Sequence, residues 1–275
     1  MAIKNKRFRW LSVLTVVLAM LVACGGWIDL SELDEAPPLG DAAPLDHSGH
    51  VLGAAPRGDG LRRIDRIGHS VGYDEDRGNP AWVAYHLIGM PAYDGGDRPG
   101  FHIDDDTEAR ISKGDYTNSG YSRGHLAPNH AIATYYGSDA QYEAFEMSNI
   151  IPQKQTLNGG AWRALEENIN GEGRYADTLG EVWVMAGPVY AESMGTLSDE
   201  GKVAIPSHCY MIIVDEDGGS YRAMAFIFPQ EPDDDYALSD FLTTIDDIES
   251  QTGLDFFSGM PGEDAVERSQ APSVW

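Results

Sequence analysis

The sequence predicts an α+β fold in which a central antiparallel β-sheet is flanked by helices. Three runs rich in β-forming residues, 181–190, 204–215 and 221–228, follow one another in the second half of the chain. The last two runs are joined through Asp217-Gly218-Gly219, which is typical of a tight hairpin turn. Segments with a helical spacing of apolar residues lie before and after these runs.

The remaining elements follow from local signals. Residues 82–87 read WVAYHL and predict an early strand. Ser138 is a candidate N-cap for a helix that runs through residue 147. A final amphipathic helix is expected over residues 236–252, and Gly253 would end it in a left-handed conformation.

The first 23 residues are expected to be a signal peptide. A basic segment precedes an apolar stretch over residues 11–23, which is too short for a comfortable membrane-spanning helix. The stretch ends in Leu21-Val22-Ala23-Cys24, which resembles a bacterial lipobox and implies a lipid on Cys24 that holds the protein at a membrane. An ordinary secreted protein is the alternative. Both interpretations export the chain, and the first anchors it to the cell envelope, at the outer membrane or on a periplasmic or extracellular face.

Composition sets the expected domain boundaries. Residues 24–60 are rich in Pro, Gly, Ala and Asp and are expected to form a flexible tether. A single folded domain is expected over residues 61–258, followed by a poorly ordered tail over residues 259–275. The chain has two cysteines, and if Cys24 carries a lipid, Cys209 has no intrachain partner. A packed core must therefore hold the fold, and Cys209 is expected to be buried in a strand.

Three short blocks carry residues suited to phosphodiester hydrolysis. Residues 122–128 read SRGHLAP, residues 148–153 read SNIIPQ, and residues 157–166 read LNGGAWRALE. Such hydrolysis needs a base to deprotonate water, a cation to neutralise the transition state, and help for the leaving oxygen.

The side chains in these blocks can meet those needs. His125 belongs to the residue type whose ordinary pKa lies near neutrality, so it can act as a neutral base. Asn158 can offer its amide oxygen to a hard divalent ion such as Mg²⁺. A helix is expected over residues 161–169, and Glu166 would lie about 12 Å along the axis from a helical Asn158. This separation is too large for both to bind one ion directly, so Glu166 is expected to contact metal-bound water.

In this order and spacing, the three blocks resemble the DNA/RNA non-specific endonuclease family, the sugar-non-specific nucleases with a ββα-metal site. The resemblance extends over residues 67–258 and implies a metal-dependent endonuclease that hydrolyses DNA, RNA or both. It implies a Mg²⁺ cofactor, with Mn²⁺ as a substitute, and a ββα-metal motif on one side of the sheet. The implied site residues are the general base His125, the magnesium ligand Asn158, Asn149 beside the base, Glu166 on metal-bound water, and Arg123 near the metal and phosphate.

Two positions depart from the family pattern. Ser122 stands where many members have aspartate, although a branch of the mitochondrial exo/endonuclease G type carries serine there. Asn170 stands where bacterial secreted members have an arginine. The arginine that stabilises the leaving phosphate must therefore lie elsewhere, and Arg98 and Arg110 are both candidates. The remaining histidines are expected to be structural, including His86, His102, His130 and His208.

The net charge opposes binding of a polyanion. The chain carries a formal charge of −25, although nucleic-acid affinity comes largely from neutralised phosphates. The charge is uneven, however. Residues 98–174 contain seven Lys or Arg against eleven Asp or Glu, a lower density of negative charge than in the rest of the chain. A bound metal ion would add positive charge at the reacting phosphate itself.

Two other functions stay open beside the nuclease. One is a phosphodiesterase that acts on smaller or different diesters, which an acidic rim around the site would favour. The other is a catalytically inactive surface-binding lipoprotein that kept the nuclease fold. An inactive protein would be expected to have lost catalytic residues, yet all four are present: His125, Asn149, Asn158 and Glu166.

Overall fold

The computed structural model describes residues 49–198, 201–260 and 262–268. The expected signal peptide, the lipid site at Cys24 and residues 24–48 of the expected tether lie outside these residues. In the described part of the chain, no helix has the length and apolar character needed to cross a bilayer.

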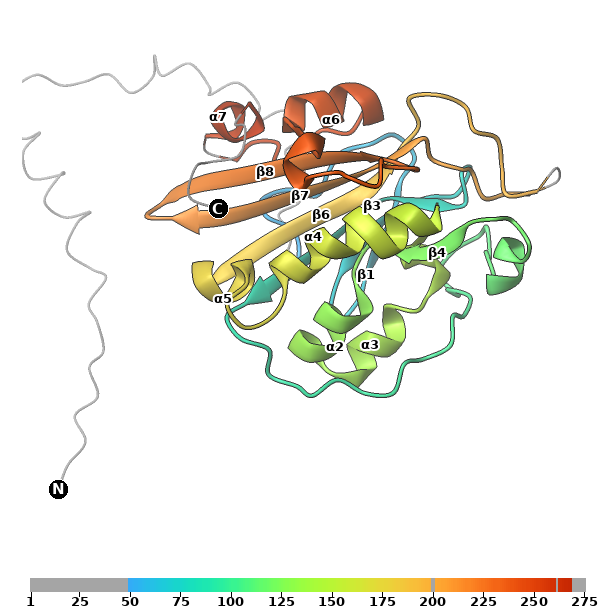
Figure 1. Cartoon of the computed structure of the whole chain (residues 1–275), viewed down its shortest axis with the longest axis horizontal. Coiled ribbons are helices and arrows are strands. Elements are labelled where there is room, and N and C mark those ends of the chain that lie inside the picture. Colours follow the sequence, from blue (N-terminus) through green and yellow to red (C-terminus); the bar gives the residue numbers. More distant parts are fainter. Residues whose placement is uncertain (1–48, 199–200, 261, 269–275) are drawn as a thin grey trace, which may run out of the picture. The chain divides into compact units, whose positions relative to one another are not determined.

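A seven-stranded antiparallel sheet forms the centre of the folded unit (Figure 1), in the order β1-β2-β3-β6-β7-β8-β9. The strands are β1 (Arg62–Asp65), β2 (Ser70–Asp74), β3 (Asn79–Ile88), β6 (Glu181–Val189), β7 (His208–Asp217), β8 (Ser220–Pro229) and β9 (Leu242–Thr243). The predicted α+β class with a central antiparallel sheet is therefore confirmed.

The hairpin between β7 and β8 forms at its predicted place. Gly218 and Gly219 are its two loop residues, with φ angles of 63° and 87°. A two-residue turn of this kind needs positive φ at both positions, which glycine adopts without steric cost. The strand expected over residues 204–215 is shifted, because β7 begins at His208. Cys209 is buried in β7 with a free thiol, as predicted.

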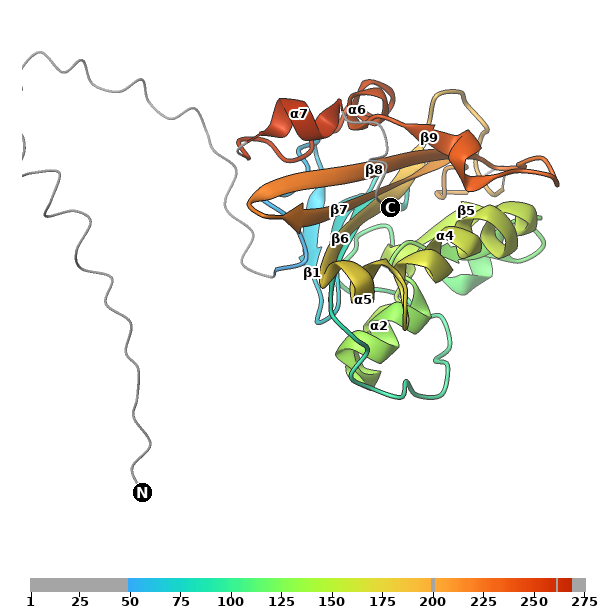
Figure 2. The same ribbon diagram turned by 60° about the vertical axis from the view of Figure 1, so that its left-hand side comes forward.

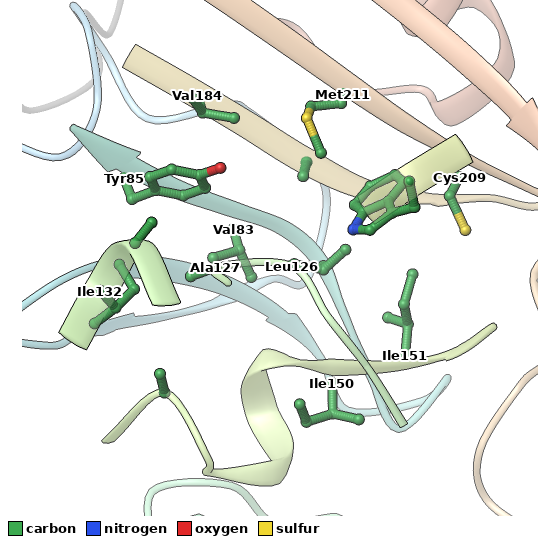
Figure 3. Close-up of a cluster of buried hydrophobic side chains, with 14 of the residues drawn as sticks. Val83, Tyr85, Leu126, Ala127, Ile132, Ile150, Ile151, Val184, Cys209 and Met211 are labelled. Atoms are coloured by element: carbon green, nitrogen blue, oxygen red, sulfur yellow. The ribbon is translucent and has the colours of Figure 1, made fainter. Parts of the chain in front are cut away.

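The two faces of the sheet bury two separate clusters. In β3, Val83, Tyr85 and Leu87 face one cluster, and Trp82 and Ala84 face the other, because side chains alternate along a strand. Figure 3 shows the first cluster, in which sheet residues such as Val184 and Met211 surround Leu126 and Ile151 from the blocks singled out in the sequence.

The first face carries a second, two-stranded sheet together with a group of helices (Figures 1 and 2). The strands are β4 (Ser122–His125) and β5 (Ile150–Gln153), and the helices are α2 (Asn129–Tyr136), α3 (Ser138–Glu143), α4 (Trp162–Ile169) and α5 (Tyr175–Leu179). The opposite face is covered by α6 (Ile245–Thr252) and α7 (Glu263–Glu267). The sheet thus separates these two groups of helices.

Two predicted helices are shorter than expected. The helix expected from Ser138 through residue 147 ends at Glu143, and Gly137 rather than Ser138 is its N-cap. The helix expected over 236–252 is replaced in its first half by a 3₁₀ turn and by β9, which pairs with β8. Helix α6 begins only after Thr244, whose side chain accepts a hydrogen bond from the backbone of Asp247, and it ends at Gly253 as predicted.

Packed residues extend beyond the boundaries expected at 61 and 258. Val51, Leu52 and Ala54 are buried although they belong to the expected tether. Arg57 exchanges backbone hydrogen bonds with Asp255, which fastens this segment to the end of the fold. Helix α7 and its buried Val266 lie within the expected tail. The folded part is longer than expected because these segments pack against the second face of the sheet, and composition alone does not reveal such nonlocal contacts.

Candidate active site

The first and second sequence blocks form the two strands of the small sheet. β4 pairs with β5 in antiparallel register, so that Gly124 lies opposite Ile151 and His125 opposite Ile150. A side chain at position 124 would meet the Gln153 amide at 2.1 Å, which explains the glycine before His125. With α4 following β5, this segment has the ββα arrangement that the sequence resemblance implies.

A cavity of about 620 Å³ opens between these elements. Of the five predicted site residues, His125, Arg123, Asn158 and Glu166 line this cavity, and Asn149 does not. The complete wall is formed by Arg98, Arg123, His125, Pro128, Asn129, His130, Ala131, Gln155, Asn158, Gly159, Arg163, Glu166, Glu167, Asn170 and Arg174.

His125 is buried against two phenylalanine rings. Its ring centroid lies 4.7 Å from that of Phe145, in an edge-on arrangement, and 5.2 Å from that of Phe101. Its Nε2 atom has no hydrogen-bond partner among the described residues. Burial, with a smaller contribution from Arg98, lowers the pKa of His125 to about 3. The imidazole is therefore neutral at physiological pH and can accept a proton.

Asn149 is fully buried, and its side chain forms hydrogen bonds with backbone groups near His125. Its Oδ1 accepts a hydrogen bond from the Ala127 N–H at 2.8 Å. Its Nδ2 donates to the carbonyl oxygens of Ala127, at 2.9 Å, and Ala144, at 2.8 Å. All polar atoms of this amide are thus engaged, and Asn149 is a positioning residue that fixes the chain leaving β4.

Arg123 is held over an aromatic ring at the cavity wall. Its guanidinium carbon lies 4.9 Å from the Phe101 ring centroid, and Nη1 donates to the carbonyl of Lys113 at 3.3 Å. Its Nε is buried and has no hydrogen-bond partner among the described residues. Ser122, which precedes it, donates a hydrogen bond to Gln155 at 2.8 Å. These contacts leave N–H donors of Arg123 available to an anion.

Asn158 lies in a turn of π-helix, Leu157–Ala161, that leads into α4. Gly160 within this turn has non-helical dihedral angles, so Asn158 and α4 do not form one regular helix. The Asn158 backbone N–H bonds to Lys154, but its side-chain amide has no hydrogen-bond partner in the described part of the chain. The amide oxygen can therefore serve as a ligand.

Glu166 brings a carboxylate to the same cavity from α4. Its Oε1 accepts a hydrogen bond of 2.9 Å from the indole N–H of Trp162. Burial raises the pKa of Glu166 to about 8, and the Trp162 hydrogen bond opposes this rise only in part. The positive charge of Arg163 also lowers this pKa but does not offset burial, and a bound cation would stabilise the ionised carboxylate further.

The donor set therefore suits a hard divalent cation. It consists of one amide oxygen from Asn158 and one carboxylate from Glu166, both on the cavity wall. Oxygen ligands of this kind are those that Mg²⁺ and Mn²⁺ prefer, and Mg²⁺ sites with few protein ligands are common.

The cavity wall contains three arginines besides Arg123, of which only Arg98 was a candidate from the sequence. Arg98 lines the cavity, whereas Arg110 forms an ion pair with Asp105 and is not part of the wall. Arg163 and Arg174 also line it, so the wall carries four arginines against two glutamates. Arg163 stands within the third block and could have been noticed there, but no local pattern marks Arg174.

The other histidines divide into two groups. His130 was expected to be structural, but it is exposed on the cavity wall. His86 bonds to Glu181 and stacks on Trp183, and His102 stacks on Tyr142. These two histidines, like His208 at the start of β7, lie outside the cavity wall.

Comparisons with known proteins agree with the geometry. Residues 54–263 match the DNA/RNA non-specific endonuclease family. The chain is 31% identical over 236 residues to the mitochondrial nuclease EXOG of Xenopus laevis, covering 78% of this chain and 62% of that protein. It is 30% identical over 204 residues to a nuclease of Serratia marcescens, covering 70% of this chain and 74% of that protein. The chain thus spans less than two thirds of the length of the Xenopus relative.

A solved structure has the same fold. The crystal structure of an EndoG/EndoGI complex superimposes with a TM-score of 0.64 and 27% sequence identity, covering 75% of this chain and 89% of the matched chain.

Proposed function

Because the chain belongs to the DNA/RNA non-specific endonuclease family, we propose that it is a metal-dependent nuclease that hydrolyses phosphodiester bonds in DNA, RNA or both. The observation that carries this proposal is the unpartnered Nε2 of His125, buried in a cavity whose wall holds four arginines. A neutral imidazole beside a cationic surface suits an anionic substrate that is attacked by water.

In this proposal His125 is the general base. Its ring is fixed by Phe101 and Phe145, and the backbone that follows it is fixed by Asn149. The imidazole would accept the proton of the attacking water. The anionic phosphodiester would favour the protonated ring, which raises the pKa of His125 from its depressed value toward the working pH.

Asn158 and Glu166 would hold the divalent cation, Asn158 through its amide oxygen and Glu166 through water. When bound, Mg²⁺ or Mn²⁺ supplies positive charge that stabilises the phosphorane-like transition state. Arg123 and Arg98 would pair with phosphate oxygens, and Arg98 is the candidate that stabilises the leaving group. Arg110 is set aside because its guanidinium pairs with Asp105 away from the cavity.

The cavity favours a polynucleotide over a small diester. Arg163 and Arg174 are exposed on its wall in addition to Arg98 and Arg123, which is more positive charge than one phosphate needs. Contacts to several phosphates bind nucleic acid without reading its bases. This arrangement would allow a chain of net charge −25 to bind a polyanion, since the wall carries four arginines against two glutamates.

A digestion assay tests the proposal. Purified protein is incubated with plasmid DNA or RNA in the presence of Mg²⁺, Mn²⁺ or EDTA, and products are followed by electrophoresis. We expect cleavage that EDTA abolishes and that falls by about 10²–10⁴-fold in His125→Ala, the usual contribution of a positioned base. His86→Ala is the control, since His86 bonds to Glu181 outside the cavity. Equal cleavage by His125→Ala and the parent protein would reject the assignment of the base.

We also propose that the protein is exported and anchored to the bacterial cell envelope through a lipid on Cys24. The basic segment, the short apolar stretch and the sequence Leu21-Val22-Ala23-Cys24 support this proposal. Cys24→Ser should move the protein from the membrane fraction to the soluble fraction. An unchanged distribution would reject lipid attachment.

A further inference from the structure

Three carboxylates meet on the face of the sheet that lies opposite the candidate active site. Helices α6 and α7 lie beside each other over this face (Figure 2). Asp246 and Glu249, three residues apart on one side of α6, approach Glu267 at the end of α7. One oxygen from each of the three side chains lies within 4.8 Å of the others.

Glu267 is the unusual member of this group. The residue is only 7% exposed, and its Oε1 has no hydrogen-bond partner in the described part of the chain. A buried carboxylate without a partner is costly, so one that faces two further carboxylates calls for a positive charge.

The nearby basic residue compensates the charge of this cluster only in part. Arg268 forms ion pairs at 3.5 Å with Asp246, one of the three carboxylates, and with Asp264, but its ion pairs among the described residues do not include Glu267. Its side chain is 67% exposed, so these pairs are screened by water. Glu249 accepts a hydrogen bond from the Phe256 N–H at 2.7 Å. The peptide dipole stabilises this carboxylate but does not neutralise its charge.

We propose that Asp246, Glu249 and Glu267 bind a calcium ion that fastens α7 to α6. Two oxygens bound to one Ca²⁺ lie at most about 5 Å apart, because each Ca–O distance is about 2.3–2.6 Å. The three carboxylates are within this limit. Ca²⁺ accepts six to eight oxygens in irregular geometry, and water can complete the shell around carboxylates from two helices. Mg²⁺ demands near-ideal octahedral geometry and loses water reluctantly, so it fits this cluster less well.

The ion would stabilise the fold rather than take part in a reaction. The cluster and the candidate active site are separated by the central sheet, since α6 and α7 pack on one hydrophobic cluster and α4 on the other. The segment between α6 and α7 contributes Phe256, Phe257 and Met260 to the second cluster. Fixing α7 to α6 would therefore also hold this buried segment in place.

Calcium-dependent thermal stability of the full chain tests this inference. The parent protein is unfolded in EDTA and in CaCl₂, and Ca²⁺ binding is measured by calorimetry. Ligand at 100 times its Kd should raise the Tm by about 5–10 °C for a domain of this size. Glu267→Gln should lose both the rise in Tm and the heat of binding, and Glu249→Gln should weaken them.

Two comparisons separate this site from the catalytic one. Asn158→Ala should keep the full Ca²⁺-induced rise in Tm, because it alters only the candidate active site. Asp264→Asn is the matched control on α7, since Asp264 is not one of the three clustered carboxylates. Glu267→Gln in EDTA should be at least as stable as the parent, which shows that it folds. An undiminished Ca²⁺ response in Glu267→Gln, or a response lost in Asn158→Ala instead, would overturn the inference.

Discussion

The indole N–H of Trp162 donates a 2.9 Å hydrogen bond to Oε1 of Glu166, one turn further along α4. Trp162 is itself buried in the first hydrophobic cluster, where its ring packs edge-on against Phe228. Because the core holds the Trp162 ring in place, this hydrogen bond also fixes the position of the Glu166 carboxylate on the cavity wall. It fixes one oxygen of Glu166 and leaves the other for a ligand.

The pH dependence of stability should reveal the burial of the Glu166 carboxyl. Its pKa is raised to about 8 in the fold, against an ordinary value near 4.3 in the unfolded chain. Its contribution to stability is therefore fully present below pH 4 and is lost as the pH rises through 8. The loss is on the order of a few kcal/mol.

Glu166→Gln isolates this effect. Without metal, the variant should match the parent near pH 4 and exceed its free energy of unfolding by a few kcal/mol at pH 9, measured by urea denaturation. Adding Mg²⁺ at pH 9 should stabilise the parent more than the variant, because only the parent has the carboxylate. A difference between the two proteins that does not change with pH would contradict the raised pKa.

Asn158→Ala should weaken the response to metal rather than the fold. Loss of the amide oxygen should raise the Mg²⁺ concentration for half-maximal cleavage by at least about tenfold, and excess metal should restore part of the rate. Asn129→Ala is the matched control, because the Asn129 amide lines the same cavity but its oxygen already accepts a hydrogen bond from Gln141. The same Mg²⁺ dependence in Asn158→Ala and the parent would remove Asn158 as a ligand.

Asn149→Ala should lower stability and activity together. The substitution removes three hydrogen bonds to buried backbone groups, which should cost about 2–4 kcal/mol. The Tm should therefore fall by about 5–15 °C, and kcat should fall because the chain that follows His125 is no longer fixed. Ser148→Ala serves as the control, since the Ser148 hydroxyl is buried without a hydrogen-bond partner among the described residues. A stable Asn149→Ala protein with unchanged kcat would refute the positioning role.

Short sequence patterns correctly predicted those elements whose turns and ends are determined by neighbouring residues. The β7–β8 hairpin follows from two adjacent glycines between β-forming runs, and the end of α6 follows from Gly253. The expected helix over 236–252 fails because Leu242 and Thr243 pair with β8, a contact that periodicity does not contain. The burial of Val51 and Leu52 is missed for the same reason, since their partners lie some two hundred residues further along the chain.

Some residues of the candidate site could likewise be predicted from the sequence, whereas others could be recognised only from the structure. His125, Arg123, Asn158 and Glu166 lie in blocks whose residue types and spacing suggest their chemistry, and all four line one cavity. Asn149 stands in such a block too, but only its hydrogen bonds show that it serves the backbone. Arg98 and Arg174 come to the cavity from a loop and from the start of α5, and no spacing rule connects them to His125.

Substituting Arg174 tests how this acidic protein binds nucleic acid. Arg174 is exposed, and its guanidinium donates a hydrogen bond of 3.1 Å to the neutral Asn168 amide, whereas Arg163 on the same wall is paired with Glu167 at 2.7 Å. Arg174 is therefore the better phosphate ligand of the two. Each neutralised phosphate contributes about 0.9 to the slope of log affinity against log salt for duplex DNA, and about 0.7 for single strands.

Arg174→Ala should therefore weaken binding most at low salt and reduce this slope by nearly one, with a smaller change in Arg163→Ala. The measurement is fluorescence anisotropy of labelled DNA across KCl concentrations, in a His125→Ala background that prevents cleavage. Arg62→Ala is the control, because Arg62 lies on β1 outside the cavity wall. If all three variants keep the same slope, the cavity arginines do not contact phosphates, and local segregation of charge cannot explain how a chain of charge −25 holds a polyanion.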